Sequence, residues 1–155
     1  MAYDVVVVGA GDAAIENALG LSEQNRVILI NRSDEFARCK EGNLNLILAA
    51  IRDGKVVGRI SAQIDHAYNE EHDSKQGWFG FIEFEDRPGI VGPMIAAAED
   101  WCRQRGMDTM VGPADFAVND ESGIVIEGHE HRPMIRQPWH PPYYQQRCEE
   151  AGHEK

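Results

Sequence analysis

The N-terminal stretch "YDVVVVGAGDAAIENALGLS", residues 3–22, places the strongest constraint on what this chain can fold into. Its run of β-branched residues, Val5–Val8, is typical of a strand buried on both faces of a parallel sheet. Glycines follow at positions 9 and 11, and apolar residues then recur at helical spacing until the next apolar run, "RVILI". The stretch therefore predicts a strand–turn–helix–strand unit.

The turn of this unit has the form GxGxxA, which suits a dinucleotide. Gly9 and Gly11 let the backbone approach a pyrophosphate, and Ala14 lets the helix pack close to the strand. A ribose-binding Asp or Glu is expected about twenty residues later, but Asn31 and Arg32 stand there, and Arg32 favours a 2′-phosphate. The alternative interpretation is that these glycines serve the turn alone.

The same segment resembles the NADPH-binding segment of the thioredoxin reductase family of flavoproteins. The stretches that carry the resemblance are "VVVVGAGDAAIENALGLS" and "VILINRSDEFARCK", within residues 4–50. Arg32, Asp34, Glu35 and Phe36 fall on matching positions of that family. The resemblance implies a dinucleotide-binding oxidoreductase fragment, with NADPH held by Gly9, Gly11, Ala14 and Arg32.

After residue 50 the pattern becomes antiparallel. Asp53-Gly54 separates two β-rich runs and predicts a hairpin, "GWFGFIEFED" predicts a strand, and residues 89–106 predict a helix that Gly106 ends. A short strand in "DTMVGP", a strand in "GIVIEG" and a last helix in "PPYYQQRCEEAG" complete the pattern. We expect an α/β fold with a single mixed sheet and helices on both faces: residues 1–50 form a Rossmann-like βαβ segment, fused to residues 51–155. Two loosely associated subdomains are the alternative.

Residues 50–155 resemble the GNAT superfamily of N-acetyltransferases. The motifs that carry the resemblance occur in family order: "RDGKVVGRISAQIDHAYNE", "GWFGFIEFED", "AAAEDWCRQRGM", "VGPADFAVNDESGIVIEG" and "PPYYQQRCEEAGHEK". The resemblance implies a partial GNAT-like α/β domain that binds acetyl-CoA, with the pyrophosphate on backbone amides at a helix N-terminus. The implied acyl-CoA contacts are Glu85, Gly89, Ile90, Val91, Gly92 and, for the pantetheine arm, Asn119.

Three residues are candidates for catalysis of acyl transfer. Glu83 and Glu85 share one face of a predicted strand, where either carboxylate suits a general base toward an amine. Tyr144 is the substitute for the acid that protonates the CoA thiolate, because Cys148 stands at the position where the superfamily often has tyrosine. The alternative for both glutamates is a solvated strand face.

The net charge and the lengths of the apolar runs limit the partners and the compartment that we expect for this chain. The formal net charge of −11 argues against nucleic acid as a partner. No apolar run is long enough to span a membrane, so we expect a cytoplasmic protein without a membrane partner. His129, His131 and His140 suggest a metal site only weakly, so no metal is expected. Three functions stay open: an acetyltransferase-like domain acting on a small-molecule amine, an NADPH-binding fragment, or an acidic inhibitor- or antitoxin-like protein with a basic protein partner.

Overall fold

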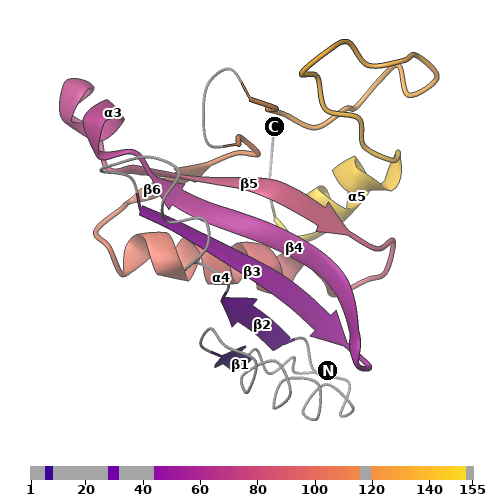
Figure 1. Ribbon diagram of the computed structural model, residues 1–155, viewed down its shortest axis with the longest axis horizontal. Helices are drawn as coiled ribbons and strands as arrows, with labels where there is room; N and C mark the ends of the chain where they lie inside the picture. Colours follow the sequence, from indigo (N-terminus) through magenta and orange to yellow (C-terminus); the bar gives the residue numbers. More distant parts are fainter. Residues whose placement is uncertain (1–5, 9–27, 32–43, 116–119, 153–155) are drawn as a thin grey trace.

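The computed structural model describes residues 6–8, 28–31, 44–115 and 120–152, with side chains from Leu48 onward. Six strands form one sheet in the order β1-β2-β3-β4-β5-β6 (Figure 1). The edge pairs β1–β2 and β5–β6 are parallel, and the three pairs between them are antiparallel. The predicted single mixed sheet of an α/β fold is therefore confirmed.

The centre of the sheet is a long hairpin of β3, Leu44–Arg52, and β4, Lys55–Ile64. Asp53 and Gly54 form its turn with φ angles of 52° and 71°. Positive φ at both central residues is the geometry of a tight hairpin turn, which Asp-Gly adopts with little strain. The predicted hairpin is confirmed. On its other side β3 pairs with β2, Ile28–Asn31, which in turn pairs with β1, Val6–Val8.

Strand β5, Gln76–Phe84, contains an irregularity that shapes the region around it. Arg59 pairs with Glu83 but Ser61 pairs with Gly80, so β5 has one extra residue opposite β4. Phe81 lies within this bulge with a φ of 46°, and its backbone N–H bonds to Asp115 Oδ1 at 2.8 Å. A bulge bends a strand and redirects its side chains, here just before the two candidate glutamates.

Helix α4, Val91–Arg103, covers one face of the sheet, behind β3–β5 in Figure 1. It contributes Val91, Met94, Ile95, Ala98 and Cys102 to the core at the three- and four-residue spacing of an amphipathic helix. These side chains pack on buried residues of β3–β5, and each large apolar side chain so buried contributes roughly 1.5–3 kcal/mol. The helix therefore covers the buried face of the central strands.

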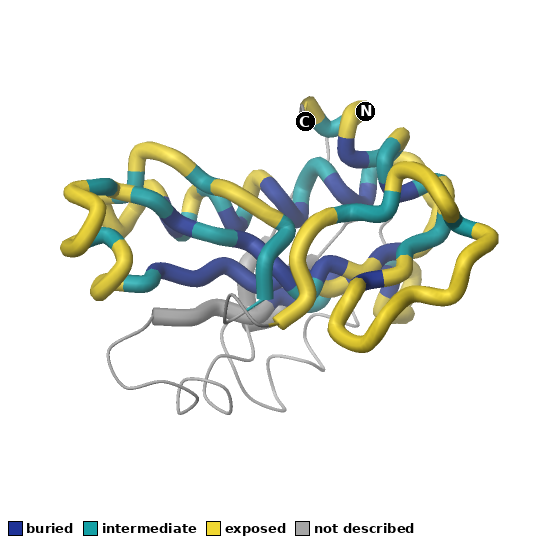
Figure 2. The backbone as a smooth tube through the Cα atoms, turned by 90° about the horizontal axis from the view of Figure 1, so that it is seen from above, coloured by how far each residue is buried: buried dark blue, intermediate teal, exposed yellow. Residues whose placement is uncertain are grey.

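The remaining elements are short. Helix α3, His66–Glu71, follows β4 and is capped by Asp65. Strand β6, Thr109–Val111, pairs with the start of β5, and α5, Tyr143–Glu150, lies at the end of β5 (Figure 1). Between them, the described residues from Pro113 to Pro142 contain no helix and only an isolated bridge, Ala114 to Ser122. We call residues 113–115 and 120–142 the roof; most of it is exposed (Figure 2).

One sequence prediction of an element is wrong. The β-branched segment "GIVIEG", residues 123–128, forms no strand. Its neighbours bond within the roof instead: Asp115 N–H bonds to Glu121 O, and Gly123 N–H bonds to Pro113 O. The proposed division at residue 50 falls within β3, which pairs with strands on both sides of it. Among the described residues no helix is long and apolar enough to cross a membrane.

Candidate functional site

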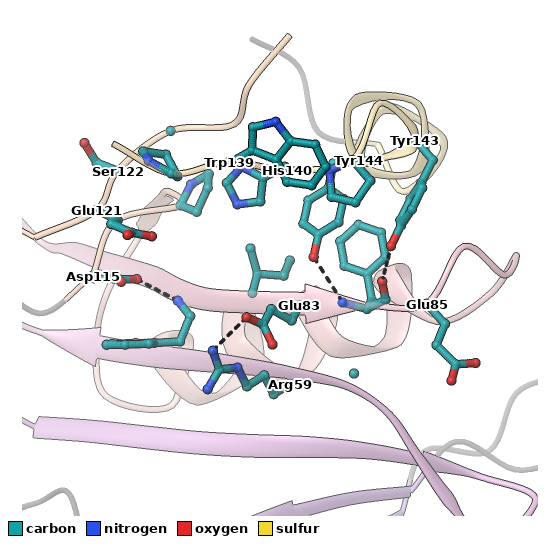
Figure 3. Close-up of a pocket in the computed structure, with 18 of the residues that line it drawn as sticks. Arg59, Glu83, Glu85, Asp115, Glu121, Ser122, Trp139, His140, Tyr143 and Tyr144 are labelled. Carbon is teal, nitrogen blue, oxygen red and sulfur yellow. Dashed lines mark hydrogen bonds and ion pairs between the residues drawn. The ribbon is translucent and has the colours of Figure 1, made fainter. Parts of the chain in front are cut away.

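A cavity of about 1000 Å³ lies between the β4–β5 pair and the roof (Figure 3). Its floor is formed by the second half of β5 and the first half of β4, and α5 closes one end with Tyr143 and Tyr144. Carboxylates outnumber cations around it. The acidic lining residues are Glu83, Glu85, Asp115, Asp120 and Glu121, and the basic ones are Arg59 and Arg136. Such a cavity favours a cationic or polar ligand with an apolar part.

Both candidate glutamates line this cavity, and each forms an ion pair. Glu83 Oε1 lies 2.9 Å from Arg59 Nη2 across the β4–β5 pair. Glu85 lies 3.6 Å from Arg87, which also reaches Asp53 of the hairpin turn at 3.6 Å. More than half of each glutamate side chain is exposed, so these pairs contribute at most about 1 kcal/mol each. The glutamates hold negative charge at the cavity floor.

Tyr144 is placed at the end of β5, against Phe84. Its ring stacks on the Phe84 ring at 4.1 Å, and its hydroxyl accepts a hydrogen bond from Phe84 N–H at 3.4 Å. The neighbouring Tyr143 hydroxyl donates to Phe84 O at 2.8 Å. Burial raises the pKa of Tyr144 to about 12, so its proton stays on the hydroxyl at neutral pH. The structure thus brings Tyr144 into one cavity with Glu83 and Glu85.

Asp115 fastens the roof to the bulge of β5. Its Oδ1 accepts the Phe81 N–H, and the Ala114 N–H beside it bonds to Phe79 O at 2.7 Å. Gln63 Nε2 donates to Ala114 O at 2.5 Å, which adds a contact from β4. Burial raises the pKa of Asp115 above its ordinary value, and the Phe81 hydrogen bond only partly opposes this. The cavity edge is therefore held by backbone bonds to two strands.

The segment Gly89–Gly92 lies outside the cavity lining and leads into α4. Ile90 and Val91 are buried, so their side chains are not available to a ligand at this turn. No side chain caps the N-terminus of α4, and Pro93 supplies no N–H to it. A Cβ added at Gly92 would meet only Ala151, at 4.0 Å. The start of α4 is therefore open on the side where Gly92 stands.

The three histidines considered for a metal site lie in the roof, where their polar contacts are with other roof residues. His129 Nδ1 is 3.1 Å from His140 O, and Trp139 Nε1 donates to His129 O at 3.2 Å. His131 is exposed and 3.2 Å from Glu130. His129 and His131 lie outside any strand, so no strand geometry places their side chains on the same side. In the described part of the chain, no three His, Cys, Asp or Glu side chains gather to hold a metal ion.

The dinucleotide candidates Gly9, Gly11, Ala14 and Arg32 lie outside the described residues, and so does Asn119. Their assignment stays a prediction. Conversely, sequence reasoning missed Arg59 and Asp115, and it considered His140 only as a metal ligand. Arg59 joins the site because the register of β4 with β5 places it opposite Glu83, a pairing between strands that the sequence pattern alone does not give. Nothing in the local pattern signalled Asp115.

The fold and the cavity define an α/β protein with a mixed sheet and an acidic, aromatic-lined pocket. Comparison with known proteins adds two relatives. The chain is 32% identical over 131 residues to Protein YghO of Escherichia coli, which covers 83% of this chain and 34% of the relative. It is 39% identical over 110 residues to a bacterial ceramide synthase of Caulobacter vibrioides, covering 70% and 29%.

The chain thus spans about a third of the length of the curated relatives it matches. No protein-family model matches the sequence, and no solved structure matches it significantly.

Proposed function

We propose that this chain forms an acyl-CoA-binding domain that transfers an acyl group, such as acetyl, to an amine. The observation that carries the proposal is the cavity at the end of β5, where Tyr144, Glu83 and Glu85 come together. The open N-terminus of α4 follows directly along the chain and offers amides to a pyrophosphate. The name of one relative also supports it, because a ceramide is the N-acyl derivative of a long-chain amino alcohol.

The chemistry is a direct transfer. The neutral amine nitrogen attacks the thioester carbonyl, the C–N bond forms, and the C–S bond to CoA breaks. The amine loses one proton to a base, and the departing thiolate gains one from an acid. Tyr144 is the candidate for the acid because it lines the cavity beside Phe84, and its raised pKa, about 12, makes it a weaker proton donor than an ordinary tyrosine. The products are an amide and CoA with a free thiol.

The acidic lining suits the acceptor more than the donor. Glu83 and Glu85 attract the ammonium form of an amine, and the aromatic rings of the roof and α5 provide apolar contact. The CoA phosphates, which are negative, are better placed at the α4 N-terminus, outside this lining. The two substrates would then meet at Phe84, where β5 ends.

A thermal-shift titration with acetyl-CoA tests the proposal. We expect the melting temperature to rise with acetyl-CoA, because a ligand that binds only the folded state stabilises it. Gly92→Leu should abolish this rise, since its side chain would project from the open start of α4 without meeting the core. The matched control is Ala96→Leu, an exposed position one turn further along the same helix.

A rise that survives Gly92→Leu would place the ligand elsewhere, and no rise in the wild type would overturn acyl-CoA binding. NADPH is titrated in parallel. A shift with NADPH alone would move the function to the N-terminal turn at Gly9 and Gly11.

A further inference from the structure

His140 lies in the cavity at the point where the roof leads into α5. It lines the cavity beside Trp139 and Tyr144 (Figure 3). Its ring centroid is 4.7 Å from that of Tyr144, and its backbone carbonyl lies 3.1 Å from His129 Nδ1. Tyr144 also stacks on Phe84 at 4.1 Å. His140 is therefore one side chain away from the end of β5, where the two substrates of the proposed function would meet.

The two ring nitrogens of His140 have different surroundings. Nδ1 is fully buried and has no hydrogen-bond partner among the described residues. Nε2 is not enclosed in this way, so it is the nitrogen through which the ring reaches the cavity. A proton on Nδ1 would enclose an N–H donor without an acceptor, which is costly. The neutral tautomer with its proton on Nε2 is therefore favoured.

The ring of His140 is mainly neutral at pH 7. Burial lowers the pKa of His140 below its ordinary value, and the charges of Glu121 and Glu83 only partly oppose this. In the favoured tautomer Nε2 carries a hydrogen and has no lone pair for another proton. His140 therefore presents a hydrogen-bond donor to the cavity and does not accept a proton there.

This donor differs from others of the cavity lining in having no acceptor within the protein. Trp139 Nε1 donates to His129 O at 3.2 Å, and the Tyr143 hydroxyl donates to Phe84 O at 2.8 Å. In the part of the chain that the structure describes, His140 Nε2 has no such partner. Its N–H is thus left for an acceptor atom of a molecule in the cavity.

We propose that His140 is a catalytic residue that donates a hydrogen bond from its Nε2–H to the carbonyl oxygen of the acyl group. The inference rests on the proposed function and adds a donor to its chemistry. When the amine nitrogen attacks the thioester carbon, the C–N bond forms and an electron pair of the C=O bond moves onto the oxygen. The hydrogen bond strengthens as this negative charge develops, which lowers the barrier.

His140 keeps its proton throughout the reaction. The C=O double bond forms again as the C–S bond breaks. The amine proton passes to a carboxylate of the cavity floor, and the departing thiolate takes a proton from the acid. A donor that stays neutral suits this acidic cavity, because it leaves the carboxylates available to the ammonium form of the acceptor.

Steady-state kinetics of the full chain with acetyl-CoA and octylamine tests this role. His140→Leu removes the donor, whereas His140→Gln keeps an N–H at the end of the side chain. The control is His131→Leu, at an exposed histidine of the same roof. We expect kcat to fall by about 100-fold or more in His140→Leu, by less than about tenfold in His140→Gln, and not at all in His131→Leu. The thermal shift with acetyl-CoA should be the same in all four proteins.

NMR gives a readout besides turnover. In long-range nitrogen–proton spectra of the wild type at pH 7, His140 should show a protonated Nε2 and an unprotonated Nδ1. Acetyl-CoA labelled at the carbonyl carbon should show a downfield shift of that carbon on binding to the wild type, and a smaller one with His140→Leu.

A protonated Nδ1, a carbonyl shift that is the same with His140→Leu, or a kcat of His140→Leu within twofold of wild type would overturn the inference alone. Equal losses of kcat in His140→Leu and His140→Gln would also overturn it. Failure of the wild type to bind acetyl-CoA would overturn the proposed function, and this role with it.

Discussion

At the scale of single residues, two glycines lie where segments of the chain are in very close contact. A Cβ at Gly80 would collide with the Ala114 carbonyl, where the roof is bonded to β5. A Cβ at Gly112 would likewise collide with Phe79. Gly92 is different, since it has open space beside it. Glycine therefore permits close packing at positions 80 and 112, whereas position 92 has room for a side chain.

This contrast gives a stability prediction. Gly80→Ala should lower the free energy of unfolding by about 1–3 kcal/mol, because the added methyl group must displace backbone rather than a flexible side chain. Gly92→Ala should raise it by roughly 0.5–1 kcal/mol, since alanine favours a helix and meets only Ala151. Urea unfolding of both variants checks this. Equal effects of the two changes would refute the packing argument.

At the scale of elements, the β3–β4 hairpin and helix α4 could be predicted from the sequence, but the arrangement of residues around the cavity could not. The hairpin followed from Asp53-Gly54, and α4 followed from the helical spacing of Val91, Met94 and Ile95. Segment 123–128 is rich in β-branched residues like a strand, yet it pairs with no strand because its neighbours bond within the roof. The residue pattern of a segment indicates whether it favours a strand, but it does not determine which strand will pair with it.

The cavity depends on contacts between distant positions. Tyr144 meets Phe84, sixty residues earlier, and Asp115 meets Phe81, thirty-four residues earlier. The Asp115 contact is made to the bulge residue of β5, Phe81, whose positive φ occurs without a glycine that the sequence could have shown. The resemblance to the GNAT superfamily suggested Tyr144, and the face of the predicted strand suggested Glu83 and Glu85. That these three residues share one cavity followed only from the tertiary structure.

The bond between Asp115 and Phe81 gives a prediction for this element. Asp115→Ala should destabilise the chain by about 1–3 kcal/mol, because the Phe81 N–H loses its acceptor. Asp115→Asn keeps an oxygen acceptor and removes a poorly solvated charge. At pH 7 it should therefore unfold at a urea concentration equal to or above that of the wild type.

The pH dependence follows from the raised pKa of Asp115. A carboxyl whose folded pKa is raised stabilises the fold below its unfolded pKa, near 3.8, and this contribution is lost as pH rises through the folded pKa. Any advantage of Asp115→Asn should thus shrink as pH falls toward 3.8. Urea midpoints measured between pH 3.5 and 7 decide it, and an advantage that grows at acid pH would contradict the assignment.

At the scale of the whole molecule, one core joins the sheet, α4 and α5. Cys102 of α4 and Cys148 of α5 are both buried in it, and burial raises the pKa of each thiol to about 11. Since the thiolate is the reactive form, both cysteines are protected twice, by enclosure and by protonation. Their reactivity therefore reports the opening of two different helices.

Alkylation at pH 8 in increasing urea tests whether these helices open together. We expect Cys102 and Cys148 to become reactive at the same urea concentration, as a two-state domain requires. Peptide mass spectrometry separates their labelling from that of Cys39, which lies outside the described residues. Reaction of Cys148 at clearly lower urea would show that α5 opens by itself and exposes the cavity end.

The roof follows β6 along the chain, and the residues at its start and just after its end form hydrogen bonds to β5. Ala114 and Asp115 bond to Phe79 and Phe81, and Tyr143 and Tyr144 bond to Phe84. These bonds all fall within six residues of one strand, from Phe79 to Phe84. A loop attached in this way can gain or lose residues without moving the rest of the sheet. We therefore expect the roof to vary in length among related proteins while the sheet and α4 keep their arrangement. Among proteins that share this architecture, we also expect differences in the ligand of the cavity to arise in the roof and not in the sheet.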